Sequence, residues 1–377
     1  MKLNSIQMLR GVAALLVVYT HSVAQMAIFA PSWQLRTPVF ISMATFGVDL
    51  FFVISGFVIY HSAERLNGRT PALSFLWHRF RRINPVYYAV VLLTVITWIP
   101  SLLRHQRPPV TGWQLLSWTI LLPLPGDPAR AISQAWTLSF EWFFYLLFFL
   151  LILLRAKGKG WILCCCLGGL SLLGWLLRSD LTGLAIFYTD PLLLEFLLGV
   201  ALGIIYRRWS PGRKIAFCLL VPGLVLGLLF MLTGFGNSQA VLAPPPPLRY
   251  LHAIYWGSTA ALVVAGCVFL EKAGKAPRFF RHRAILLLGD ASYSIYLFHL
   301  LVLGLIAAIY LRVGFFLNAD VLIPIHAVIA VAVSLLFYKW VELPLLNWLR
   351  SIRPSRPPRS IRSSDPPRPI PPRSAKP

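Results

Sequence analysis

The sequence predicts an all-α, polytopic membrane protein, a bundle of about ten transmembrane helices with both termini cytoplasmic. Of its 377 residues, 58% are hydrophobic and only 12% are charged, which lies outside the range of water-soluble globular domains. The apolar residues form stretches of about 20, the length at which an α-helix crosses a bilayer. The basic residues gather in alternate short connections between these stretches. We therefore expect residues 1–350 to form one membrane domain.

Ten stretches have the length and composition of membrane spans. They cover residues 8–30, 39–60, 84–103, 135–154, 161–177, 184–206, 215–234, 251–270, 285–311 and 321–343. The first is a span rather than a cleavable signal segment, because it is long, carries Arg10 and His21, and ends without a small-residue cleavage pattern. The longest connection, residues 104–134, is rich in Pro and Trp, which predicts a re-entrant or interfacial segment on the extracytoplasmic side.

The distribution of charge predicts the orientation. Connections near residues 65–82, 155–159, 207–214 and 272–283 are strongly basic, and the positive-inside rule places them in the cytoplasm with both termini. The net charge of +23 does not indicate nucleic acid as a partner, because the basic residues lie in loops and a tail without a folded basic domain. We expect the Pro-, Arg- and Ser-rich tail, residues 351–377, to be disordered and attracted to anionic membrane lipid.

An ionisable residue inside a membrane span costs free energy and by default marks a functional site. Arg10 and His21 share one stripe of the first span, because eleven residues advance a helix by about 16 Å and return to within about 20° of the same face. The arginine would lie at one membrane surface and the histidine deep inside. Alternatively, Arg10 anchors the topology and His21 donates a hydrogen bond between helices.

Three further ionisable residues fall at depths where they could meet His21. Asp49 and His299 fall near mid-depth, and Glu141 lies toward the extracytoplasmic end of its span. Together these four residues could form one buried polar cluster, in which a carboxylate orients an imidazole and raises its basicity. The alternative is a set of hydrogen bonds that only hold the bundle together.

Two segments present polar helix faces that could point into the bundle. Their members, spaced by three or four residues, are Thr137, Glu141 and Tyr145 in one segment and Ser292, Tyr296 and His299 in the other. Aromatic residues flank the first face, an arrangement consistent with a site for a sugar or a cofactor. Aromatic belts at membrane interfaces have a similar composition.

A pair of arginines follows the second span. Arg79 and Arg82, three residues apart in a cytoplasmic loop, would share a face if that loop were helical. Paired guanidinium groups at a membrane surface suit phosphate or pyrophosphate. Juxtamembrane arginines are also common as topology anchors, so both interpretations stay open at this point.

Six segments occur in order along the first 350 residues. They are Leu9-Arg10-Gly-Val-Ala-Ala with His21 eleven residues after the arginine, Phe46-Gly-Val-Asp-Leu-Phe-Phe-Val-Ile-Ser-Gly-Phe57, Arg79-Phe-Arg-Arg82-Ile-Asn-Pro85, Trp136-Thr-Leu-Ser-Phe-Glu141-Trp-Phe-Phe-Tyr145, Leu288-Gly-Asp-Ala-Ser-Tyr-Ser-Ile-Tyr-Leu-Phe-His299 and Val341-Glu342-Leu-Pro344. This series resembles the membrane acyltransferase-3 family of bacterial surface-polysaccharide O-acyltransferases. One departure is Trp142 after Glu141, where members often carry a second acidic residue.

The resemblance implies an acyl-CoA donor that reaches the site from the cytoplasm and transfer of its acyl group, most often acetyl, to a sugar hydroxyl. The family's Arg-x10-His pattern corresponds to Arg10 and His21, and its Arg-x-x-Arg pattern to Arg79 and Arg82. The chain is most similar to exopolysaccharide acetyltransferases, since it ends after the membrane unit. A multi-pass protein of the bacterial inner (plasma) membrane is expected.

We interpret the chain as an integral membrane O-acyltransferase that moves an acetyl or other short acyl group from acyl-CoA to a hydroxyl of a cell-surface or lipid-linked polysaccharide. The candidate catalytic residues are His21, as general base, with Asp49, Glu141 or His299 as its partner or proton relay. The candidate donor-binding residues are Arg10, Arg79 and Arg82, whose planar cations would hold the CoA phosphates.

Other classes of site and function are also constrained. No metal and no permanently bound cofactor is expected, and none of the five cysteines is placed as a metal ligand or a thiol nucleophile. The main alternative function is a proton-coupled transporter or flippase, in which the same intramembrane residues would form a proton relay. The glycan, the acyl chain and the oligomeric state are left open.

The predicted topology can be tested by cysteine labelling of intact cells. In a cysteine-free background, we expect Gly236→Cys to react with a membrane-impermeant thiol reagent and Arg69→Cys to be protected, because short basic connections stay cytoplasmic. The reverse pattern would invert the bundle and place the paired arginines on the side where no CoA is available.

Overall fold

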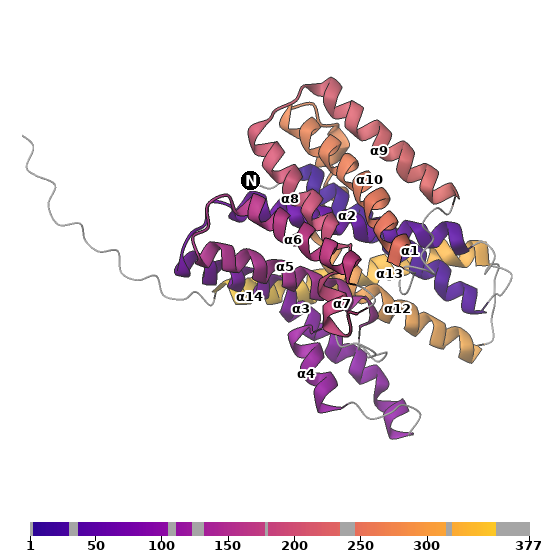
Figure 1. Ribbon diagram of the computed structural model, residues 1–377. Helices are drawn as coiled ribbons and strands as arrows, with labels where there is room; N and C mark the ends of the chain where they lie inside the picture. Colours follow the sequence, from indigo (N-terminus) through magenta and orange to yellow (C-terminus); the bar gives the residue numbers. More distant parts are fainter. Residues whose placement is uncertain are drawn as a thin grey trace, which may run out of the picture.

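The computed structural model describes residues 3–29, 37–104, 111–122, 132–177, 180–233, 246–313 and 319–351, and these residues are almost entirely helical (Figure 1). No β-strand occurs among them. Ten helices within these ranges are long and apolar enough to cross a membrane, which confirms the predicted all-α class and number of spans. The side chains of residues 27–45 and the whole tail after residue 351 lie outside the described part.

The helices, in chain order, are α1 (Asn4–Phe29), α2 (Thr37–Ala63), α3 (Arg69–Leu103), α4 (Gly112–Ile120), η2 (Ser133–Ala135), α5 (Trp136–Leu153), α6 (Lys159–Leu176), α7 (Leu184–Tyr188), α8 (Leu193–Arg208), α9 (Arg213–Thr233), α10 (Pro246–Lys272), η4 (Arg278–Arg281), α11 (Arg283–Asp290), α12 (Ser292–Val313), α13 (Ala319–Phe337), the π-helical turn η5 (Tyr338–Glu342) and α14 (Leu343–Ser351). Helix α1 packs against α2, α10, α11, α12 and α13, so it is the central helix of the bundle. Helices α9 and α10 lie side by side at one edge, with α3 and α4 at the opposite edge (Figure 1).

Three of the predicted spans differ from the helices of the structure. Helix α3 begins at Arg69 rather than at residue 84, so the loop expected around Arg79 is part of a helix. The sequence did not predict this extension, because charged residues are tolerated inside a membrane bundle only where they reach a polar cavity, and hydropathy does not reveal such a cavity. The stretch 285–311 is divided between α11 and α12, and the stretch 184–206 is divided at Pro191, which has no N–H to continue a helix.

The predicted interfacial segment is described only in part. Within residues 104–134, the structure describes a short helix, α4, which begins with a capping box made by Thr111 and Gln114. Trp118 on this helix is buried against Trp98 of α3, with ring centroids 6.1 Å apart. The intervening residues 105–110 and 123–131 lie outside the described ranges.

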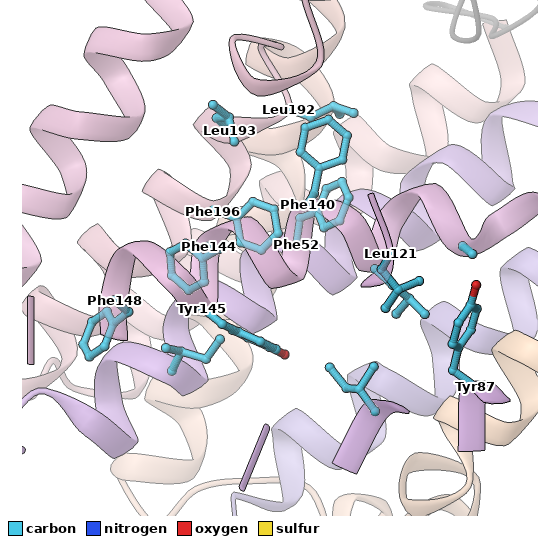
Figure 2. Close-up of a cluster of buried hydrophobic side chains, with 14 of the residues drawn as sticks. Phe52, Tyr87, Leu121, Phe140, Phe144, Tyr145, Phe148, Leu192, Leu193 and Phe196 are labelled. Atoms are coloured by element: carbon cyan, nitrogen blue, oxygen red, sulfur yellow. The ribbon is translucent and has the colours of Figure 1, made fainter. Parts of the chain in front are cut away.

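An aromatic cluster joins α2, α5 and α8 (Figure 2). The ring of Phe196 lies 4.7 Å from that of Phe52 and 4.9 Å from that of Phe144, measured between centroids. All three side chains are fully buried, and aromatic pairs at such distances add to the free energy gained by burial. The cluster fixes the side of α5 that carries Tyr145 relative to α2, which positions the polar face of α5.

Helices α2 and α8 approach each other through glycines. A Cβ atom added at Gly199 would lie 2.1 Å from the carbonyl oxygen of Val53 and 3.0 Å from the Cα atom of Gly56. One added at Gly203 would lie 2.7 Å from the ring of Tyr60. Small residues at a helix interface let two backbones touch, which is how membrane helices gain packing energy without a hydrophobic driving force.

We expect Gly199→Ala to destabilise the folded protein. The added methyl group has no room against α2, and overpacking of this kind costs about 1–3 kcal/mol. Gly169→Ala is a matched control, because it lies in α6 with no atom within 4 Å of its added Cβ. Thermal unfolding of the purified variants in detergent measures the difference, and equal melting temperatures would contradict the close contact between α2 and α8.

Candidate active site

A cavity of about 440 Å³ lies between α1, α2, α3, α5 and α12, within the size range of small-molecule sites. Helix α2 supplies much of its apolar wall, including Phe51 and Phe52. Its polar lining residues are Gln7, Arg10, Ser55, His61, Ser62, Arg79, Arg82, Thr137, Glu141, Tyr145, Ser292, Tyr293 and Tyr296. The predicted face of Thr137, Glu141 and Tyr145 lines this cavity, and so do Ser292 and Tyr296 of the second predicted face, whereas His299 does not.

Three arginines from two distant parts of the chain meet in this cavity. Arg10 of α1 lines the cavity together with Arg79 and Arg82 of α3. Arg10 is close enough to Arg82 and Glu141 to interact electrostatically with both. Among the described lining residues, Glu141 supplies the one carboxylate against these three guanidinium groups. The cavity therefore carries an excess of positive charge and suits an anionic ligand.

The arginines of α3 point in different directions, because neighbouring residues of a helix lie on different faces. The guanidinium group of Arg79 donates a hydrogen bond to Ser62 Oγ (3.1 Å) and lies 5.2 Å from the ring centroid of Phe75, a cation–π distance. Arg82 shares its face and stays exposed at the cavity, whereas Arg81 donates to the carbonyl oxygen of Leu349 (3.0 Å) and does not line the cavity.

Glu141 accepts hydrogen bonds with both carboxylate oxygens. Ser55 Oγ donates to its Oε1 atom (2.6 Å), and the hydroxyl group of Tyr145 donates to its Oε2 atom (3.2 Å). Hydrogen bonds to an ionised carboxylate are among the stronger ones in proteins, so this carboxylate is held in place as the counter-charge of the arginines. The single carboxylate at this position is sufficient to balance one of the three cations.

His21 and His299 contact each other and do not line this cavity. His299 is fully buried, and its Nε2 atom lies 3.3 Å from Nδ1 of His21. Nδ1 of His299 lies 2.9 Å from the carbonyl oxygen of Ile295, and Nδ1 of His21 lies 2.9 Å from that of Val17. A carbonyl oxygen only accepts, so both imidazoles carry their proton on Nδ1. In the neutral form, Nε2 of His21 is then free to accept a proton.

This geometry separates the three residues that the sequence offered as partners of His21. His299 contacts His21 directly, and Glu141 lies among the arginines of the cavity. Asp49 faces α8 and α10, where its Oδ1 atom lies 3.4 Å from Nε2 of His252. The four residues therefore do not share one cluster, because a matching depth along the bundle does not fix the direction in which a side chain points.

A second cavity of about 450 Å³ lies farther along α3 and α12. Its polar lining comes from Thr94, Thr97, Ser101, Ser133 and Gln134. Both helices pass the arginine-lined cavity first and this cavity afterwards, so the two cavities occupy different depths of the bundle. Under the predicted topology, the second cavity is the extracytoplasmic one.

A small polar partition separates the two cavities. Tyr296 lines the first cavity and Leu297 lines the second, and Gln134 Nε2 donates to the carbonyl oxygens of both residues (3.1 and 3.0 Å). The hydroxyl group of Tyr296 lies 3.0 Å from Thr137 Oγ1. His299 follows on the same helix, its ring centroid 6.4 Å from that of Tyr296. The histidine pair therefore lies at the depth of this partition.

Sequence reasoning did not single out two members of this site. Ser55 lies within the quoted segment 46–57, but a serine between apolar residues carries no periodic signal. Gln134 precedes the helix of Glu141 and is identified only by its partners on α12. Glu342 of the last quoted segment is buried and accepts a hydrogen bond from Ser294.

The acyltransferase domain family matches residues 3–339 of the chain. The chain belongs to the acyltransferase-3 family. It is therefore an acyltransferase and, with its ten apolar helices, a multi-pass membrane protein. No solved structure matches it.

Curated relatives extend the likeness over most of the chain. It is 29% identical over 314 residues to the exopolysaccharide production protein ExoZ of Rhizobium meliloti, covering 81% of this chain and 91% of that protein. It is 27% identical to the acyltransferase MdmB of Streptomyces mycarofaciens, covering 80% and 79% of the two chains. It is 26% identical to the peptidoglycan O-acetyltransferase OatA of Listeria monocytogenes over 67% of this chain and 44% of that protein.

Proposed function

We propose that this acyltransferase moves an acetyl group from acetyl-CoA to a hydroxyl group of an exopolysaccharide or of its lipid-linked precursor in the bacterial inner membrane. The observation that supports the donor is the arginine-lined cavity, in which three guanidinium groups face one carboxylate. The names of ExoZ and OatA support a polysaccharide acceptor and acetyl transfer.

Acetyl-CoA would bind with its phosphates at the arginines and its thioester directed inward. Arg82 is exposed at the cavity and Arg79 is half-buried, so the two can reach a phosphate and a pyrophosphate from adjacent positions on α3. A guanidinium group keeps its charge when partly buried and binds phosphate oxygens in pairs. The apolar wall of α2 would contact the pantetheine arm.

The chemistry needs a base more than an electrophile, because a thioester is already activated. Nε2 of His21 would accept the proton of the acceptor hydroxyl group as its oxygen attacks the thioester carbonyl carbon. The C–S bond then breaks, the new ester forms, and the thiolate of CoA takes the proton from His21. His299 acts as a positioning residue, since its Nε2 atom faces the Nδ1–H group of His21 and fixes the tautomer.

The acceptor would enter through the second cavity. Its threonine, serine and glutamine side chains can exchange hydrogen bonds with sugar hydroxyl groups, and Trp98 adds an aromatic surface. Donor and acceptor then approach the partition at Tyr296 from opposite ends of α3 and α12. The competing function, a proton-coupled transporter or flippase, predicts no turnover of acetyl-CoA by the purified protein.

We expect His21→Ala to abolish acetyl transfer while leaving membrane insertion intact. Loss of a general base costs about 10²- to 10⁴-fold in rate. The assay follows the free thiol released from acetyl-CoA by the purified protein in the presence of the acceptor saccharide. His326→Ala is a matched control, because His326 is also a histidine inside the bundle but contacts Tyr310 instead of the His21–His299 pair. Activity of His21→Ala within a few-fold of the control would remove His21 from the mechanism.

We expect Arg79→Ala and Arg82→Ala to weaken CoA binding. A lost charge-assisted hydrogen bond costs about 1.5–3 kcal/mol, or about 10- to 100-fold in Kd. Lysine at either position should restore part of this loss, because it keeps the charge without the bidentate geometry. Arg81→Ala controls for loss of charge from the same helix. Calorimetry measures the dissociation constant of CoA. If Arg79→Ala and Arg82→Ala bind CoA as tightly as Arg81→Ala does, Arg79 and Arg82 are topology anchors.

A further inference from the structure

A second polar cluster lies between α2, α8 and α10, outside both cavities. It consists of Asp49, Glu195 and His252, one residue from each helix. One ligand atom of each residue lies within 4.8 Å of those of the other two, and Nε2 of His252 lies 3.4 Å from Oδ1 of Asp49. Asp49 and Glu195 are fully buried, and His252 is nearly so.

The two carboxylates of this cluster have unmet bonding capacity. Both oxygens of Glu195 and the Oδ2 atom of Asp49 are buried without a hydrogen-bond partner among the described residues. In the same part of the chain, no lysine or arginine forms an ion pair with either carboxylate, and the nearby Arg249 binds Asp190 (Nη1 to Oδ2, 2.7 Å). Two ionised carboxylates without a counter-charge in a bilayer interior would cost several kcal/mol each, so either a bound cation or bound protons must neutralise them.

The helices that carry the cluster are held close together. Asp49, Val53 and Gly56 form one stripe of α2, and this stripe contacts α8 at Gly199, four residues after Glu195. A Cβ atom added at Gly257 of α10 would lie 2.9 Å from Cγ of Glu195. The three donor groups are therefore fixed by backbone packing rather than by their own hydrogen bonds. A preorganised donor set of this kind is the geometry of a binding site.

We propose that Asp49, Glu195 and His252 bind a divalent metal ion, with Zn²⁺ as the ion that the donor set favours. Two carboxylates cancel the charge of a divalent cation, and a neutral imidazole completes a mixed nitrogen and oxygen set of the kind that Zn²⁺ accepts. Mg²⁺ and Ca²⁺ prefer oxygen ligands alone. The ion ties α2, α8 and α10 together on the side of α2 that faces away from the arginine-lined cavity.

No local spacing motif marks this site in the sequence, because its three ligands lie more than fifty residues apart from one another. The site is separate from the machinery proposed for acetyl transfer, since none of its three residues lines either cavity or hydrogen-bonds to the His21–His299 pair. Metal binding can therefore be measured without any assay of activity.

The test uses the purified full-length protein in detergent, stripped with a chelator and then titrated with Zn²⁺. We expect one equivalent of Zn²⁺ per chain by calorimetry and elemental analysis, together with a rise in melting temperature. Glu195→Gln and Asp49→Asn keep the shape of each side chain but should weaken Zn²⁺ binding by more than the 10- to 100-fold that is typical of lost contacts around a metal site. His326→Ala should bind as the wild type does.

Co²⁺ provides a readout that does not depend on stability. Bound in place of Zn²⁺, it should give visible absorption bands typical of a low-coordinate nitrogen and oxygen site in the wild type, and these bands should be absent from Glu195→Gln and His252→Ala. The proposal is overturned if the wild type binds no stoichiometric Zn²⁺, or if the folded Glu195→Gln variant binds it with unchanged affinity. The carboxylates would then be neutralised by bound protons.

Discussion

The architecture depends on the cost of charge in a low-dielectric interior, where an ionised side chain is stable only beside an opposite charge or enough hydrogen bonds. Arg249 meets Asp190 across the gap between α10 and the start of α8. Glu141 meets the arginines of the cavity and two hydroxyl donors. These pairings decide which helix faces turn inward, so the positions of the charges determine how the helices of the bundle pack.

Helix α2 contributes residues to both polar regions, the arginine-lined cavity and the cluster of Asp49, Glu195 and His252. Most of its residues from Val48 onward face the arginine-lined cavity, while the stripe through Asp49 and Gly56 faces α8. Adjacent residues of one helix thus serve different sites, because successive side chains are separated by about 100°. The glycine contact keeps this helix from rotating, since a turn in either direction would drive a side chain into the backbone of α8.

The sequence predicted the fold class, the number of spans and the two polar faces of α5 and α12, because these follow from hydropathy and helical periodicity. It placed Arg79 in a loop, although Arg79 lies in α3. Hydropathy assigns only apolar residues to a membrane helix, and it does not reveal the polar cavity that allows this charged segment to be part of one. It could not choose among Asp49, Glu141 and His299 as partners of His21. Periodicity gives the face of a residue on its own helix, but the neighbour across that face is set by packing between segments that are far apart in the chain.

The thin partition at Tyr296 has an electrical consequence. Two polar cavities that approach it from opposite ends of α3 and α12 shorten the insulating path to the side chains between them. Under the predicted topology the membrane potential would fall mainly across this layer, and one elementary charge moved through 100 mV changes free energy by about 2.3 kcal/mol. In the proposed acetyl transfer, a proton that passes from the acceptor hydroxyl group to the thiolate of CoA would move within this field, which would couple the rate of transfer to the energised state of the membrane.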